Sequence, residues 1–170
     1  MVVPDDAADF IREQYPQLVG LLGLYCGDRV LAEELAQDAL ERVCRDWRRV
    51  RRKDNAVAWT RRVAINLANS HFRRKAAEQR ATTRLRAGVL KTVERDDVAS
   101  LVLRESVASL PLRQRTAVVL HYFLDMSFPE VAEFMDIPLS TGKSLVRRGL
   151  ARLRQNAVRE EKELRDAGLS

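Results

Sequence analysis

Five cationic side chains stand close together near the C-terminal end of the chain, with no acidic residue among them: Lys143, Arg147, Arg148, Arg152 and Arg154. Apolar residues recur through the same stretch at helical spacing and predict a buried stripe opposite much of the charge: Val146, Leu150 and Leu153. Cations on the exposed side of a helix contact nucleic-acid phosphates, and polar side chains in its first turns reach base edges. The alternative is a surface helix with solvated arginines, but the missing counter-charges argue against it. We therefore expect this helix to bind DNA.

Another helix is expected directly before the cationic one. Ser127 and Glu130 have the spacing of a capping box, in which the serine hydroxyl accepts from the amide of residue 130 and the glutamate reaches back. Pro138 disfavours helical backbone at the residue before it, so this helix is expected to end there. Ser140 or Thr141 is then expected to cap the cationic helix. Two helices joined by so short a turn predict a helix-turn-helix, which places its second helix in the major groove.

A second basic region lies between Arg45 and Lys75, where eleven Lys or Arg residues occur with only two acidic residues. We expect one helix over Ala56–Ala77, with an inner stripe at Trp59, Val63 and Leu67. Its other positions carry mainly cations, amides and hydroxyls: Arg61, Arg62, Asn66, Asn69, Ser70, Arg73, Arg74 and Lys75. Charge suits the backbone of single-stranded nucleic acid, whereas rings and amides suit unstacked bases. Trp59 and Phe72 could instead be ordinary core residues, so both readings stay open for this helix.

The N-terminal part of the chain predicts further helices. Asp5 or Asp6 can cap the first, Pro16 is expected to end or kink it, and Gly27–Asp28 marks a stop and a new cap. The next helix is expected over Arg29–Arg49, with apolar residues at a spacing of four: Leu31, Leu35, Ala39, Val43 and Trp47. Its outward face is acidic and polar: Glu34, Gln37, Asp38 and Glu41. On its own this pattern indicates a solvated face.

The helical periodicity is lost between Glu78 and Val98, and the charged composition of this stretch indicates a flexible tether. No stretch shows the alternation of a strand. We therefore expect an all-α protein of two small helical domains, with a first domain over 1–80, a linker over 81–97, a helix-turn-helix domain over 98–157 and a charged C-terminal tail over 158–170.

The composition narrows the classes of function. The net charge of +6 and the pI near 9.8 favour an anionic partner. No apolar run approaches the roughly 18–20 residues of a membrane span and no signal-peptide pattern occurs, so we expect a cytoplasmic protein. Cys26 and Cys44 lie outside any metal-binding motif, and neither His71 nor His121 has companions at ligand spacing. We expect no metal, cofactor, small-molecule substrate or enzymatic activity, because no nucleophile–base pair or phosphate-binding loop occurs.

Three stretches in this order resemble the extracytoplasmic-function group of bacterial RNA polymerase sigma factors, the minimal kind with only the second and fourth sigma domains. GDRVLAEELAQDALERV is similar to the helix that docks on the polymerase clamp, and AWTRRVAINLANSHFRRK is similar to the promoter-melting helix. The stretch from Ser109 to Arg154 is similar to the whole fourth domain. The resemblance implies an alternative sigma factor that binds core RNA polymerase and directs promoter-specific initiation. Such a factor reads the −35 element with its helix-turn-helix and opens the −10 element with its second domain.

The resemblance also implies roles for particular residues. The −35 element would be contacted by Lys143, Ser144, Arg147 and Arg148. The −10 element would be contacted by Arg61, Arg62, Asn66, Arg73 and Arg74, with Asn66 helping to hold a flipped base. The clamp coiled-coil would be faced by Glu34, Gln37 and Asp38. The polymerase flap and an anti-sigma factor are expected as further partners. Gly142 and Leu145 depart from the family's usual residues, which are β-branched and basic at these two positions.

Two other functions stay open from the residues alone. A self-sufficient helix-turn-helix regulator would bind duplex DNA as a symmetric dimer without polymerase, but it gives no role to Asn66 or to the acidic face. A protein-binding helical adaptor would leave the uncompensated basic helices unexplained.

Overall fold

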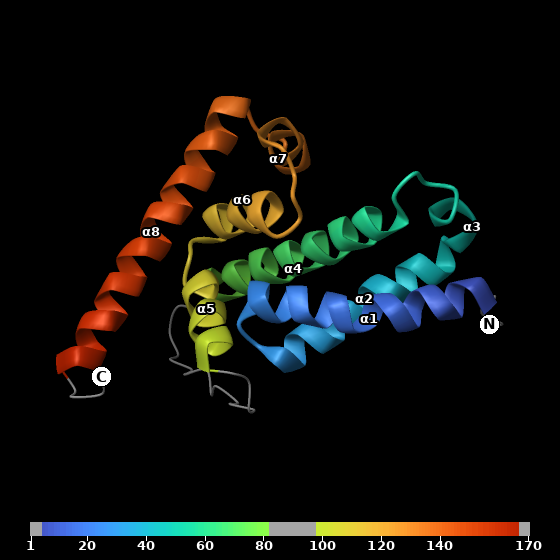
Figure 1. The fold of residues 1–170 in the computed structure, drawn as a ribbon. Coiled ribbons are helices and arrows are strands. Elements are labelled where there is room, and N and C mark those ends of the chain that lie inside the picture. Colours follow the sequence, from blue (N-terminus) through green and yellow to red (C-terminus); the bar gives the residue numbers. More distant parts are fainter. Residues whose placement is uncertain (1–4, 82–97, 167–170) are drawn as a thin grey trace. The chain divides into compact units, whose positions relative to one another are not determined.

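The computed structural model describes residues 5–81 and 98–166, and within them the regular structure consists of eight helices and no strand, as the all-α prediction requires. The chain divides into two compact units, Met1–Asp97 and Val98–Ser170. The first contains α1 (Asp5–Cys26), α2 (Arg29–Arg45), α3 (Trp47–Val50) and α4 (Ala56–Ala81). The second contains α5 (Val98–Ala108), α6 (Leu112–Tyr122), α7 (Phe128–Met135) and α8 (Leu139–Asp166) (Figure 1). The predicted linker falls almost wholly on residues 82–97, outside the described residues.

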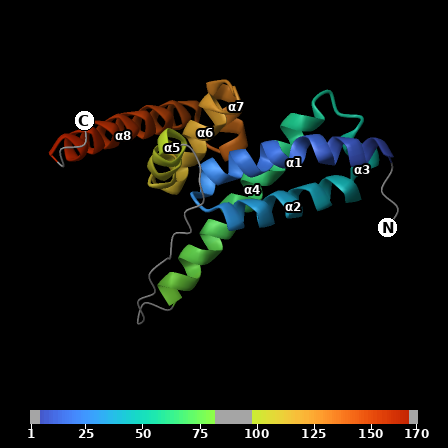
Figure 2. The same ribbon diagram turned by 60° about the horizontal axis from the view of Figure 1, so that its bottom comes forward.

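The first unit is built on α1, α2 and α4, each of which packs against the other two. Leu18, Leu22, Tyr25 and Ile65 are among its fully buried side chains. A second group of buried residues contains Val43 and Trp47, and Phe10 and Trp59 pack against it. The C-terminal part of α4 extends past α1 and α2 (Figure 2). Residues in that part of the helix are therefore exposed around much of its circumference.

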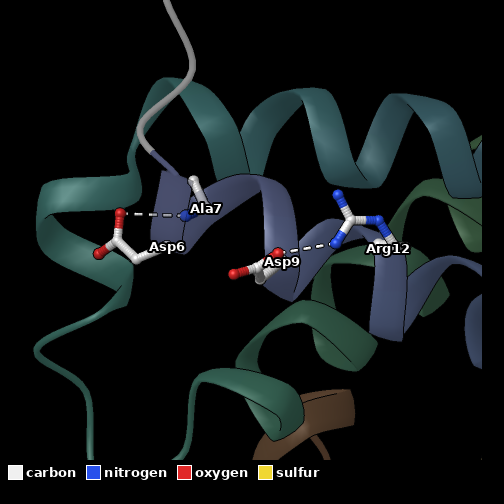
Figure 3. A network of polar contacts seen from close by, with 4 residues as sticks. All are labelled: Asp6, Ala7, Asp9 and Arg12. Carbon is white, nitrogen blue, oxygen red and sulfur yellow. Dashed lines mark hydrogen bonds and ion pairs between the residues drawn. The ribbon is translucent and has the colours of Figure 1, made fainter.

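The start of α1 differs in detail from the sequence expectation. The helix begins at Asp5, and the carboxylate of Asp6, inside the first turn, accepts from the backbone N–H of Ala7 at 3.0 Å (Figure 3). The Arg12 guanidinium donates to the Asp9 carboxylate at 2.7 Å one turn further on (Figure 3). Pro16 does not end the helix, which continues to Cys26. Proline removes one backbone hydrogen bond, but Gln14 and Leu18, two residues away on either side, are both buried and hold the two halves of the helix against the core.

The boundary between α1 and α2 is the one that Gly27–Asp28 predicted. Gly27 has a φ of 69° and its N–H donates to the Gly23 carbonyl at 2.9 Å, while Asp28 accepts from the backbone N–H of Leu31 at 3.1 Å. The predicted helix over Arg29–Arg49 was wrong at its end, because α2 stops at Arg45 and the chain turns at Asp46. This turn directs Trp47 of α3 onto Phe10, with the two ring centroids 5.1 Å apart.

The helix α4 starts where expected but runs four residues further than the predicted Ala77, to Ala81. Its first turn is capped by Asn55, whose side-chain oxygen accepts from the backbone N–H of Ala58 at 2.8 Å. Asparagine is a favoured N-cap residue, so Asn55 is a local sequence signal for this helix start, which the prediction from periodicity did not use.

The second unit packs α6 against α7 and α8, with α5 against α8. Leu110, Val118, Val119 and Val131 are fully buried in it. Arg115 is also buried, and its guanidinium donates to the carbonyls of Ala108 and Leu110 where α5 ends. These bonds satisfy carbonyls that the end of α5 leaves without helical partners.

The helix-turn-helix is formed by α7 and α8. The Ser127 N–H donates to the Glu130 carboxylate at 2.8 Å and the Glu130 N–H donates back to the Ser127 hydroxyl at 3.4 Å, so the capping box is confirmed. The expectation that Ser140 or Thr141 caps the next helix was wrong, because α8 already begins at Leu139. Pro138 precedes it, and its carbonyl accepts from the N–H groups of residues 141 and 142. A proline at a helix start has no N–H to leave unsatisfied, so the helix can begin directly behind it.

The described part of the predicted C-terminal tail, 158–166, continues α8 without a break. Within residues 5–81 and 98–166, no helix combines the length and the apolar composition that crossing a membrane requires.

Candidate nucleic-acid interface

The first turns of α8 present the cationic side chains that the sequence predicted for DNA. Lys143, Arg147 and Arg148 are exposed, and Ser144 is half-buried. Arg148 donates to the Ser144 hydroxyl through Nε at 3.1 Å and through Nη2 at 2.8 Å. The bond aligns the guanidinium along the helix, and its remaining N–H groups can still donate to a base or a phosphate. Four predicted residues therefore lie together on one surface.

A stack of three side chains joins this surface to the rest of the second unit. The Lys143 ammonium lies 6.0 Å from the centroid of the Phe128 ring, within range of a cation–π interaction. His121 stacks on the same ring, with centroids 4.3 Å apart and planes 19° apart. The His121 Nδ1 lies 2.7 Å from the Met126 carbonyl oxygen, which can only accept, so Nδ1 carries a proton. The stack connects α6, α7 and α8 at the place where Lys143 would meet DNA.

Two other residues of α8 face the interior. Leu145 is 9 % exposed and Val146 is 3 % exposed. The hydrophobic stripe predicted at Val146, Leu150 and Leu153 is therefore joined by Leu145, while Leu150 and Leu153 are half-buried. A buried side chain cannot reach a groove of DNA, so Leu145 packs the helix and contacts no base.

The predicted −10 residues of α4 are brought together only in part. Arg62, Asn66 and Arg73 share one face, because they are four and seven residues apart. Asn66 and Arg73 are exposed and Arg62 is half-buried, and the exposed Arg74 lies next to this face. Arg61 points about 100° away round the helix.

Two residues of α4 that the sequence grouped with this face have partners inside the first unit. Arg61 donates to the Gln17 side chain of α1 at 3.0 Å. Asn69 accepts from the hydroxyl of Tyr25, whose side chain is fully buried. The Asn69 oxygen is therefore occupied within the first unit, whereas the Asn66 side chain is exposed. The two asparagines differ because the fold brings Asn69 to Tyr25, and the residue type alone gives no sign of this contact.

The outward face of α2 carries the three residues predicted to meet polymerase. Glu34, Gln37 and Asp38 are all exposed. The opposite face is buried against α1 and α4, with Leu35 and Ala39 among its residues. The acidic face therefore belongs to a helix that is held rigidly from behind.

Cys44 is a titratable group outside the three surfaces described above. Burial, and next the charge of Glu41, raises the pKa of the Cys44 thiol, so this cysteine is no activated nucleophile at neutral pH. Among residues 5–81 and 98–166, no three His, Cys, Asp or Glu side chains gather as ligands for a metal ion.

Two family models match the chain, one in each unit. Sigma-70 region 2 matches residues 10–78, and Sigma-70, region 4 matches residues 100–153. The chain is 29% identical over 157 residues to the RNA polymerase sigma-E factor of Streptomyces coelicolor, covering 92% of this chain and 89% of that protein. It is 33% identical over 139 residues to the RNA polymerase sigma-E factor of Streptomyces antibioticus, covering 82% of this chain and 74% of that protein.

A solved structure shares the fold. The sigma factor RpoE from Bartonella quintana, co-crystallised with the anti-sigma factor NepR, matches with a TM-score of 0.66 at 21% identity. The match covers 88% of this chain and 96% of that one.

Proposed function

Because the chain belongs to the sigma-70 family, as a sigma factor of the extracytoplasmic-function type that directs promoter-specific transcription, we propose that its two units read two separate parts of one promoter. The observation that carries this proposal is that each unit holds one exposed face suited to nucleic acid. The cations of α8 lie in the unit that matches region 4, and the face of Arg62, Asn66 and Arg73 lies in the unit that matches region 2.

The second unit reads the −35 element as a duplex. The N-terminal turns of α8 enter the major groove, where Lys143 and Arg148 donate to guanine acceptors and Arg147 contacts the backbone. The stack of Lys143 on Phe128 and the bond from Arg148 to Ser144 hold both donors before DNA arrives. Less side-chain freedom is lost on binding when donors are already held in place.

The first unit reads the −10 element after its strands part. Arg62, Arg73 and Arg74 attract the phosphates of the separated strand, and Asn66 offers a donor and an acceptor to an extruded base. Flipping a base costs a few kcal/mol, so contacts in this unit and binding of polymerase together offset it. Arg61 supports this face from beside α1 through its bond to Gln17.

Core RNA polymerase binds the protein through both units. The exposed carboxylates of Glu34 and Asp38, with the Gln37 amide, face the clamp coiled-coil, and the second unit faces the flap. The protein is a transcription initiation factor that works beside polymerase in the cytoplasm, and we assign it no catalytic activity. We also assign it an anti-sigma partner, of the class that NepR represents for the Bartonella sigma factor.

Run-off transcription with purified core polymerase tests this function. The protein is added or omitted on a pool of promoter fragments. Discrete new start sites that need both components are the expected result, and alignment of the fragments gives the −35 and −10 sequences. If no start sites appear and the protein alone binds duplex in a salt-sensitive manner, it is a free-standing regulator and the proposed function is wrong.

A further inference from the structure

The recognition helix α8 crosses α6 at Gly149, where there is no room for a side chain. A β-carbon at position 149 would lie 2.5 Å from Val118 Cγ2 and 3.4 Å from the Gln114 carbonyl oxygen. Real β-carbons essentially never come within 3.0 Å of another heavy atom, so Val118 alone forbids the methyl group. Val118 is 1 % exposed and cannot turn into solvent. The two helices therefore approach as closely as they do because residue 149 is glycine.

Gly142 gives a matched comparison on the same helix. A β-carbon there would lie 3.5 Å from the Ala132 Cβ of α7, which is ordinary van der Waals contact. Both glycines are buried and both lie in α8. Of the two, only Gly149 is under a steric limit. This limit explains why glycine stands there despite its low helix propensity.

The close contact lies directly behind the residues proposed to read the −35 element. Arg147 and Arg148 immediately precede Gly149 in one uninterrupted helix, so a shift of α8 at this point moves both guanidinium groups. To widen 2.5 Å to the 3.5 Å seen at Gly142, the helices would have to separate by about 1 Å. Hydrogen bonds to base edges span only about 2.7–3.2 Å, and a recognition site misplaced by about 1 Å loses its function.

We propose that Val118 and Gly149 form a knob-and-hole contact that sets how α8 is presented to the major groove. Gly149 is then a positioning residue for −35 recognition, although it touches no DNA. This inference rests on the proposed role of α8 and names a residue outside the predicted DNA-contacting set.

The test compares holoenzymes reconstituted from core polymerase and the full chain. Binding is measured on promoter fragments with the −35 element intact or substituted at one base pair, and the ratio of the two affinities is the discrimination. Gly149→Ala should lower this ratio by about tenfold, the contribution of one good base contact. Gly142→Ala is the control and should leave the ratio unchanged. Thermal melting of each free protein confirms that it is folded at the temperature of the assay.

The rescue variant separates positioning from a loss of stability. Val118→Ala removes the obstructing methyl group, so the Val118→Ala, Gly149→Ala pair should recover most of the lost discrimination. A folded Gly149→Ala protein with unchanged discrimination would overturn the proposal, as would a pair that discriminates no better than Gly149→Ala. If Gly149→Ala alone does not fold, the double variant Val118→Ala, Gly149→Ala is compared with Val118→Ala. For the proposal to stand, the discrimination ratio of the double variant must be at least as high as that of Val118→Ala. Arg148→Ala is run alongside, because its failure to change the ratio would instead refute the proposed role of α8.

Discussion

At the scale of residues, Asn66 and Asn69 lie three positions apart on α4 and have opposite surroundings. Asn69 accepts from the buried Tyr25 hydroxyl, so Asn69→Ala should lower the free energy of unfolding by about 1–3 kcal/mol. Asn66 is exposed, so Asn66→Ala should change that free energy by less than about 0.5 kcal/mol. Asn66→Ala should instead impair promoter opening. Denaturant unfolding and permanganate reactivity of the melted region measure the two effects separately.

The pair serves as its own control. Unchanged permanganate reactivity with Asn66→Ala would remove this residue from the melting mechanism. Equal destabilisation by both substitutions would contradict the assignment of Asn69 to the interior.

Residue types alone could not separate these cases. The sequence identified the cations of α8 correctly as an exposed group, because an apolar stripe and missing acidic residues are local signals. It could not tell that Asn69 binds Tyr25, since the two residues are 44 positions apart and meet only when α1 packs on α4. It also grouped Arg61 with Arg62, although their different directions on the helix give Arg61 a partner in α1.

At the scale of elements, α8 contains a glycine that the packing does not require. Gly142→Ala should raise the free energy of unfolding of the second unit by up to about 1 kcal/mol, because alanine is the better helix former and its methyl fits against Ala132. Equilibrium unfolding in urea measures the change. A destabilised Gly142→Ala protein would show that the contact with α7 is tighter than 3.5 Å.

The start of α1 makes the first unit sensitive to acid. The pKa of the Asp6 carboxyl lies below its ordinary value of 3.8 because of the neighbouring Trp47 indole and the Arg51 guanidinium, which lies 3.4 Å away. The Trp47 Nε1 makes no hydrogen bond of good geometry within the described residues, so the ion pair with Arg51 is the contact that the geometry supports. Folding therefore favours the ionised form, and the stabilisation is full above pH 3.8 and lost as the pH falls through the lower, folded value. Asp6→Asn should flatten the fall in stability at acid pH. Unfolding curves measured at a series of pH values below 5 test this, and identical slopes for both proteins would contradict it.

Element boundaries were predicted where a local chemical signal set them. The capping box at Ser127 and the stop at Gly27 are local, and both are present in the structure. The end of α2 at Arg45 was missed because no proline or glycine marks it. Packing of Trp47 on Phe10 accompanies the turn there, and that contact joins residues 37 positions apart.

At the scale of the whole molecule, the two units carry three charged surfaces, of which the faces on α4 and α8 are cationic and the face on α2 is acidic. The acidic face of α2 should hold polymerase, so Glu34→Lys with Asp38→Lys should weaken binding to core polymerase and leave the unfolding free energy nearly unchanged, since both side chains are exposed. Competition for core polymerase against the native protein measures the affinity. Asp9→Lys, at an exposed position of α1, is the control. An equal loss of affinity for core polymerase with this variant would show a general effect of charge and contradict a specific role of the α2 face.

The central claim is that the two units read different promoter elements, and run-off transcription with variant holoenzymes tests it most directly. Native protein, Arg148→Ala and Asn66→Ala are each assayed on the native promoter, a −35-substituted promoter and a −10-substituted promoter. Arg148→Ala should lose activity equivalent to about 1–3 kcal/mol on the native promoter and become nearly indifferent to the −35 substitution. Asn66→Ala should keep its dependence on the −35 element and lose that on the −10 element. If both variants instead lose the same activity on all three promoters, the claim of two separate reading surfaces is wrong.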